Sequence, residues 1–143
     1  MNPPHKNIID FLKNNQIATV CFTDTSNNPY CINCFYCFNE EHNVLIFKSS
    51  YGTTHEAFIK ENKHSAGTIV ANQIKISKLK GLQFTGKILG QQQIQELKLH
   101  TSYIKKFPIS IAMPGYIWGV ELTFIKFTDN TLGFGKKEIW TKQ

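Results

Sequence analysis

The sequence predicts a mainly β protein, an antiparallel sheet with flanking helices, and three stretches predict it. Residues 17–48 contain three short apolar runs separated by turn-rich segments. Residues 80–89 alternate apolar and polar side chains, as a strand with one buried face does. Residues 116–127 form a longer run of the same kind. The 143 residues suffice for one core of ordinary size, so we expect a single domain over residues 1–143.

The first third of the chain is expected to be a helix followed by a three-stranded meander. Asn2 is the candidate N-cap of the helix, with a proline in its first turn, and the helix should end near residue 15. Turn-rich segments then divide the chain into strands. The expected strands are residues 17–23, 30–38 and 44–48.

The remaining elements follow from a capping box and from further alternation. Thr53 followed by Glu56 starts a second helix that should end near residue 62. The later expected elements are strands at 65–71 and 80–89, a helix at 91–104, a strand at 116–127 and two short extended pieces within 131–140. On the long strand, Trp118, Val120, Leu122 and Phe124 are expected to share one face.

Residues 31–37, CINCFYC, have a spacing close to that of a metal or iron–sulfur site. They lie within an expected strand, where side chains alternate between faces. Cys31 and Cys37 would therefore point one way and Cys34 the other, and the three could not converge on one ion. Cys21 sits on the neighbouring strand and could face one of them. We expect no metal site and interpret the four cysteines as small buried hydrophobic residues.

Residues 48–55, KSSYGTTH, lie where a strand ends and a helix begins. A helix N-terminus presents free N–H groups and a partial positive charge. The hydroxyls of Ser49, Ser50, Thr53 and Thr54 can donate to phosphate oxygens, and His55 adds another donor. The same residue types also make an ordinary capped helix start, so the segment by itself fits both interpretations.

The formal net charge is +6, and all 16 basic residues are lysines. Arginine is the usual side chain for bidentate phosphate and guanine recognition, so we do not expect a nucleic-acid partner. No pair of carboxylates is spaced for hydrolytic chemistry. No apolar run spans a membrane, and no signal peptide is recognisable, so we expect a cytoplasmic protein.

The order of elements, together with two motifs, resembles the pyridoxamine-5'-phosphate-oxidase-like, FMN-binding split-barrel superfamily over nearly the whole chain. One motif is the SYGTTHEAF segment at residues 50–58, together with the strand before it. The other is residues 127–137, FTDNTLGFGKK, with Phe107-Pro108 upstream and Trp140 downstream. It resembles the uncharacterised YhbP-type branch. The resemblance implies a six- to seven-stranded antiparallel split β-barrel with two to three peripheral helices, and a homodimer with FMN at its interface.

The resemblance also implies roles for single residues. The flavin phosphate would lie at the helix start, where Thr54-His55 stands in place of the family's basic pair. In the family, the C-terminal hairpin, often that of the partner subunit, sends a basic side chain to the flavin, and here Lys136 or Lys137 would take that role. Gln83 would line the flavin ring. The aromatic residues expected near the flavin site are Tyr36, Phe47, Tyr51, Tyr116 and Trp118.

The expected function is that of an FMN-binding flavoprotein, an oxidoreductase or reductase with an unknown small-molecule substrate. The Arg-x-His pair that grips the substrate phosphate in pyridoxal-phosphate-forming enzymes is absent, so that particular activity is not expected. The alternative is a non-catalytic binding module of the same fold that holds flavin, haem or another phosphate ligand.

Overall fold

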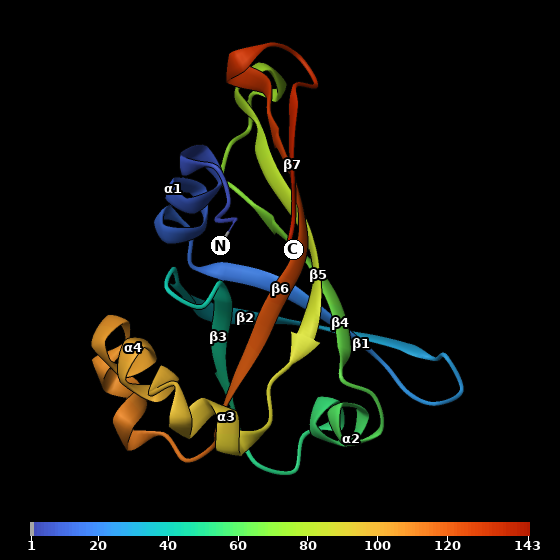
Figure 1. The fold of residues 1–143 in the computed structure, drawn as a ribbon, viewed down its shortest axis with the longest axis vertical. Coiled ribbons are helices and arrows are strands. Elements are labelled where there is room, and N and C mark those ends of the chain that lie inside the picture. Colours follow the sequence, from blue (N-terminus) through green and yellow to red (C-terminus); the bar gives the residue numbers. More distant parts are fainter. Residues whose placement is uncertain (1) are drawn as a thin grey trace.

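The computed structural model describes residues 2–143, which fold into one antiparallel sheet with helices packed around it (Figure 1). The strands are β1 (Ile17–Thr23), β2 (Pro29–Asn39), β3 (Val44–Ser49), β4 (His64–Val70), β5 (Lys80–Ile88), β6 (Tyr116–Asp129) and β7 (Lys137–Thr141). The α-helices are α1 (Lys6–Asn14), α2 (Thr54–Glu61), α3 (Gln91–Glu96) and α4 (Leu99–Lys106). Short 3-10 turns are η1 (Ile76–Lys78), η2 (Pro108–Ala112) and η3 (Asn130–Leu132).

The strands follow the order β3-β2-β1-β4-β5-β6-β7, and β3 also pairs with β6. That extra pairing closes six strands into a barrel. The first half of β6 pairs with β3 from Tyr116 to Glu121, while its second half pairs with β7 from Phe124 to Thr128. The strand β6 therefore leaves the barrel part-way along its length. This confirms the predicted mainly β fold, a split antiparallel barrel with peripheral helices.

Two apolar clusters stabilise the barrel. The larger fills its interior and includes Phe22, Phe47 and Phe84. The smaller lies outside the barrel wall, where Val44 and Ile46 of β3 pack against α3 and α4. Because successive strand residues point to opposite faces, β3 is buried on both sides. This explains why its sequence is continuously apolar rather than alternating.

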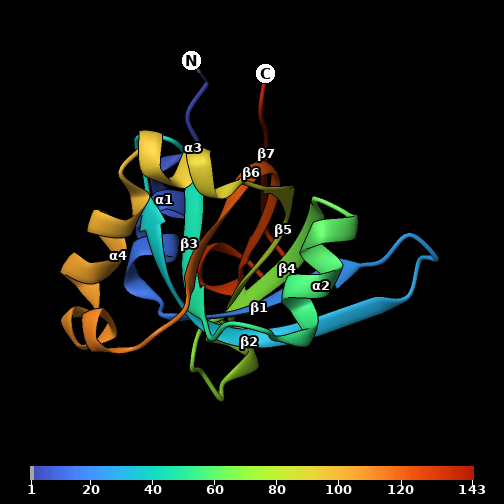
Figure 2. The same ribbon diagram turned by 90° about the horizontal axis from the view of Figure 1, so that it is seen from below.

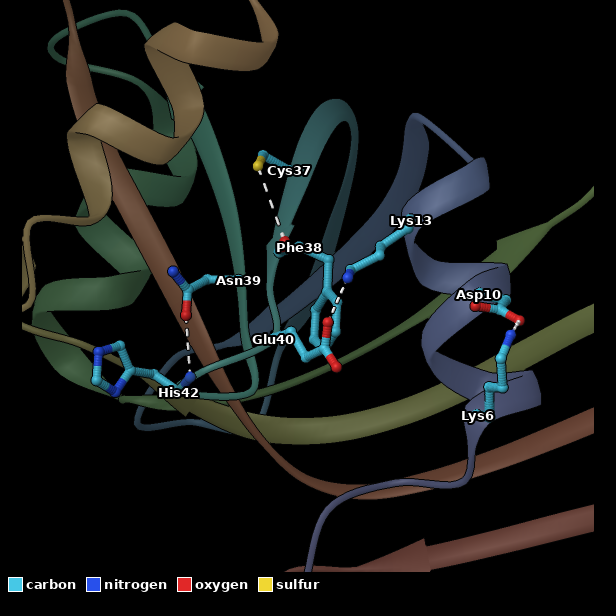
Figure 3. A network of polar contacts seen from close by, with 8 residues as sticks. All are labelled: Lys6, Asp10, Lys13, Cys37, Phe38, Asn39, Glu40 and His42. Carbon is cyan, nitrogen blue, oxygen red and sulfur yellow. Dashed lines mark hydrogen bonds and ion pairs between the residues drawn. The ribbon is translucent and has the colours of Figure 1, made fainter.

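Polar contacts join the helices to the turns of the sheet (Figure 3). The side chain of Lys13 on α1 contacts Glu40 in the turn after β2. In the same turn the His42 amide donates to the Asn39 side chain at 2.9 Å. The Lys13–Glu40 contact holds the end of α1 against the β2–β3 turn, and the bond from His42 to Asn39 lies within that turn.

The structure confirms the predicted meander and corrects the ends of two helices. The first helix has His5 as its N-cap, and Asn2 instead donates from its side chain to the Thr141 carbonyl. The helix expected over 91–104 is broken into α3 and α4, because Lys98 adopts the left-handed conformation with φ 53°. The chain therefore has four α-helices within residues 2–143 rather than two or three.

The predicted face of β6 is correct only as far as Leu122. The pairing with β5 shifts there: Gly86 pairs with Leu122 and Thr85 with Phe124, so Thr123 is an extra residue. A bulge of this kind reverses which side chains face the core. Ile125 accordingly lies in the barrel interior, and Phe124 does not.

The cysteines point as the strand pattern predicted. Cys34 packs against the barrel core and Cys37 lies in the outer cluster. Within residues 2–143, no three His, Cys, Asp or Glu side chains are grouped to hold a metal. The expectation that all four are buried is correct only for Cys37: Cys21 and Cys34 are half-buried, and Cys31 is exposed. None of the helices in the described part of the chain is long and apolar enough to cross a membrane.

Candidate functional site

A cavity of about 970 Å3 opens beside the end of β3. The helices α2 and α4 lie on opposite sides of that strand end, and both views show this arrangement (Figures 1 and 2). Residues from both faces of β2, the β3–α2 loop, α4 and η2 all contribute to its lining. The volume is at the upper end of the roughly 300–1,000 Å3 usual for small-molecule sites.

The N-terminus of α2 forms one part of the lining. Thr53 is the N-cap, and its hydroxyl accepts from the Glu56 amide at 3.4 Å. The Glu56 carboxylate accepts from the Gly52 amide at 2.6 Å, which completes the helix start. Within residues 2–143, the amides of Thr54 and His55 have no acceptor. Free amides at a helix N-terminus favour an anion.

Lys48 brings a positive charge to the same cavity. Its side chain is half-buried, and Nζ donates to the carbonyl oxygen of Ser110 in η2 at 2.6 Å. Lysine has three donors, so this bond leaves others for a ligand. No aspartate or glutamate of the described chain lines the cavity. A lysine, a helix N-terminus and the absence of carboxylates in this lining together favour an anionic ligand.

Ser110 adds an unusual polar group. The residue is 4% exposed and lines the cavity, but its hydroxyl has no hydrogen-bond partner among residues 2–143. A buried hydroxyl without a partner costs free energy, about 1–3 kcal/mol. A polar ligand in the cavity could supply the missing partner.

Apolar and aromatic side chains line the rest of the cavity. The rings of Tyr103 and Phe107 in the α4 segment are tilted against each other, with centroids 5.1 Å apart, and Phe35 of β2 contacts Phe107 edge-on at 5.9 Å. Ile109 and Met113 are 79% and 58% exposed. A large apolar wall beside a few fixed polar groups is typical of cofactor sites.

His55 lines the cavity but is largely buried. Its ring stacks on Phe22 at 5.6 Å, and Nε2 lies 3.2 Å from the Thr53 hydroxyl. Burial lowers the pKa of His55, although the nearby Glu56 carboxylate opposes that shift. The imidazole is therefore neutral more often than a free histidine, and it contributes a hydrogen bond rather than a fixed charge.

Five of the predicted site residues lie together. Ser49, Ser50, Thr53, Thr54 and His55 all line the cavity, as the helix-start interpretation implied. Of these, Ser49 is already engaged, because its hydroxyl accepts from the indole Nε1 of Trp118 at 3.0 Å.

The other three predicted residues do not reach this cavity within one chain. Gln83 is exposed on β5, where it pairs with Thr68 and Lys126. Lys136 and Lys137 lie where η3 leads into β7, at the opposite end of the molecule from α2 and α4 (Figure 1). Only a second copy could bring these side chains to the site.

The aromatic residues near the site were predicted less well. Tyr36 and Phe47 are fully buried in the barrel core, and neither lines the cavity. Tyr51, Tyr116 and Trp118 contact one another in series beside it, at centroid distances of 4.7 and 5.5 Å. The aromatic residues in the lining are instead Tyr30, Phe35, Tyr103 and Phe107. Strand alternation places Tyr30 and Tyr36 on the same face of β2, but alternation alone does not show which of them lines a cavity.

Comparison with known proteins places the chain in a family. A UPF0306 protein of Photorhabdus laumondii is 36% identical over 132 residues, which cover 92% of each chain. This chain belongs to the UPF0306 family. A second UPF0306 protein, from Yersinia enterocolitica, is 31% identical over 144 residues and covers 99% of this chain and 97% of its own. No family model matches the sequence.

Solved structures share the fold of this UPF0306 chain at low sequence identity. A pyridoxamine 5'-phosphate oxidase-related, FMN-binding protein of Nostoc punctiforme superposes with a TM-score of 0.71 at 9% identity, over 96% of this chain and 89% of its own. A haem-binding protein of Mycobacterium smegmatis superposes with a TM-score of 0.70 at 10% identity, over 92% of this chain and 55% of its own. The UPF0306 chain thus spans about half of that protein. An FAD-binding protein of Mesorhizobium loti superposes with a TM-score of 0.64 at 12% identity, over 83% of this chain and 89% of its own.

Proposed function

We propose that this UPF0306 protein binds FMN in the cavity beside β3 and is a flavin-dependent oxidoreductase or reductase of a small-molecule substrate. The observation that carries the proposal is the lining itself: Lys48 and the free amides of α2 beside an aromatic wall, with no carboxylate from the described chain. Neighbours of the same fold that are named as binding FMN, FAD or haem support it.

The donor set fits a phosphate monoester. The amides of Thr54 and His55, the hydroxyls of Ser50 and Thr53, and the Lys48 ammonium can each donate to phosphate oxygens. The unpartnered hydroxyl of buried Ser110 adds a further donor from η2.

The phosphate end of the site supplies only part of the free energy that micromolar binding requires. Such affinity requires about 8 kcal/mol. A charge-assisted bond from Lys48 contributes about 1.5–3 kcal/mol, and the α2 terminus contributes roughly 0.3–1 kcal/mol. The remainder must come from burial of the ring system against the aromatic wall, at about 25 cal/mol per Å2 before association costs.

When bound, a flavin supplies hydride and electron transfer, and the chain supplies binding and orientation. The α2 terminus and Lys48 would hold the phosphate. Phe35, Tyr103 and Phe107 would exclude water from one side of the ring system.

We also propose a homodimer with the cofactor at its interface. Phe35 and Ile109, at the cavity rim, are 54% and 79% exposed, and a second copy could cover them. The second copy could also supply Gln83, Lys136 or Lys137. Lys137→Ala is expected to weaken FMN binding and leave the free energy of unfolding unchanged. If that variant binds FMN with the same affinity as the wild-type protein, Lys137 does not contact the cofactor.

Assignment to the YhbP-type branch is part of the same proposal. The run at residues 127–137 supports it, and membership of UPF0306 is consistent with it.

The test is the absorbance spectrum of the purified protein after incubation with FMN and removal of free ligand. Retained flavin bands, lost on substitution of Lys48, are expected. Loss of all flavin from the wild-type protein would refute FMN as the ligand. Addition of NADH or NADPH under anaerobic conditions then asks whether the bound flavin is bleached, which an oxidoreductase requires.

A second candidate is a binding module without turnover, holding flavin, haem or another phosphate ligand. One observation favours it, and it concerns His55. Apart from Lys48, a cysteine and two tyrosines, His55 is the one ionisable side chain in the described lining. It is buried against Phe22 and bonded to Thr53. It is poorly placed for proton transfer to a substrate. A flavin that stays oxidised with both nicotinamides, or a Soret band after haem addition, would favour this candidate.

A further inference from the structure

Cys21 and Cys31 lie directly opposite each other on β1 and β2. They share a face with Thr19 and Asn33, the next pair along the same two strands, whose side chains meet at 2.8 Å. Cys31 is exposed and Cys21 is half-buried. The two thiols are therefore adjacent, and one of them is open to solvent.

The backbone bonds at both ends of this ladder show which kind of pair the cysteines form. The Tyr36 amide donates to the Gln16 carbonyl at 2.8 Å, and the Asp24 amide donates to the Asn28 carbonyl at 3.2 Å. In an antiparallel ladder, hydrogen-bonded pairs alternate with pairs that are not. In the register that pairs Cys21 with Cys31, these bonds join residue 16 to residue 36 and residue 24 to residue 28. Even-numbered residues on the β1 side therefore belong to hydrogen-bonded pairs, and odd-numbered residues such as Cys21 do not. The cysteines thus form a non-hydrogen-bonded pair.

That pair type sets the distance between the two residues. In non-hydrogen-bonded pairs the Cα atoms are about 4.5 Å apart and the side chains are at their closest. Disulfides usually span about 4.4–6.8 Å between Cα atoms. A bond between Cys21 and Cys31 would fall at the short end of this range. It could form without moving the backbone, but under strain, which makes a disulfide easier to reduce.

We propose that Cys21 and Cys31 are a reversible thiol–disulfide site that reacts with low-molecular-weight disulfides. The Cys31 thiolate attacks one sulfur of the small disulfide and releases one small thiol, which leaves a mixed disulfide on Cys31. Cys21 then loses its proton and attacks the Cys31 sulfur, which releases the second thiol. Two protein thiols are oxidised, and one small disulfide is reduced to two thiols. This site is independent of flavin binding.

The surroundings decide the order of attack. Burial and the neighbouring Cys31 raise the pKa of Cys21 to about 12, so Cys21 is the poorer initial nucleophile. The part of this shift that comes from Cys31 disappears once Cys31 is in a mixed disulfide. Burial also raises the pKa of Cys34 to about 12 and raises that of Cys37. Those two thiols point to opposite faces of β2 and have no cysteine opposite them.

Incubation of the native, reduced protein with oxidised glutathione tests the proposal. The intact mass should fall by two hydrogen atoms, and a non-reducing peptide map should show the Cys21–Cys31 link. Added reduced glutathione should reverse it. Cys21→Ser should stop at one bound glutathione on Cys31, and Cys31→Ser should lose the reaction. Cys37→Ser is the matched control and should react as the wild type does.

Three results would overturn the proposal. They are a wild-type protein that stays reduced, one that accumulates glutathione on Cys31 without closing the disulfide, and one whose map links Cys34 or Cys37. The Cys21→Ser variant keeps the test decisive, since it separates failure of the first attack from failure of the second.

Discussion

Thr53→Ala tests the α2 helix start as both a structural cap and a phosphate site. Removal of an N-cap hydroxyl costs about 0.5–2 kcal/mol. The bond from the Glu56 amide to Thr53 is long, at 3.4 Å, and the 2.6 Å bond from Gly52 to Glu56 remains. We therefore expect the lower half of that range, about 0.5–1 kcal/mol. For a chain of this size this corresponds to a fall in melting temperature of roughly 1–4 °C.

The same substitution should remove one hydrogen bond to the phosphate of FMN. A bond to a charged group contributes about 1.5 kcal/mol or more, so the Kd for FMN should rise roughly tenfold. Urea unfolding measures the first effect and fluorescence titration of FMN the second. Thr53→Ser keeps the hydroxyl and should restore both. Lower stability with an unchanged Kd in Thr53→Ala would refute the location of the phosphate at α2.

The remaining predictions concern packing, pH and charge. Gly67→Ala should destabilise the fold by about 3 kcal/mol in urea unfolding, because an added Cβ would lie 2.2 Å from the Thr19 carbonyl oxygen. Gly81→Ala, whose Cβ would meet nothing closer than 3.8 Å, should change stability by less than about 1 kcal/mol, and equal losses would contradict the packing argument. Because burial lowers the pKa of His55 from 6.5, the unfolded chain binds its proton more readily. Stability should thus fall as pH drops below about 6.5, and less so in His55→Gln; identical pH profiles would exclude this histidine as the cause. Lys48→Met should raise the Kd for FMN about tenfold or more, whereas the exposed Lys105→Met should not change it; matched values would remove Lys48 from the site.

Turn chemistry and side-chain alternation are local, and they predicted the local elements well. The strand expected at 17–23 is β1 as observed, and Thr53 is the cap of α2 as expected. The break at Lys98 was missed because neither glycine nor proline marks it. The bulge at Thr123 was missed because it depends on the register between β5 and β6, which a single strand does not encode.

The candidate site likewise has one part that the local sequence predicts and other parts that depend on the tertiary fold. Its phosphate end lies in one contiguous segment, and capping residues revealed it. Its other parts come from distant segments: the bond that joins Lys48 to Ser110 spans 62 residues of sequence. The η2 segment has no motif of its own, so its place beside β3 could not be predicted without the tertiary fold.

Barrel closure between β3 and β6 has a consequence for synthesis of the protein. The residues Val44–Phe47 are fully buried in the finished molecule, but their closing partner extends to Glu121. At roughly 5–20 residues per second, a ribosome needs roughly 4–15 s to make the segment between them. Throughout that interval the nascent chain carries an open strand edge that is apolar on both faces, the type of edge most prone to pair with other chains. The order of strands therefore makes the early nascent chain, rather than the finished protein, the form most in need of a chaperone.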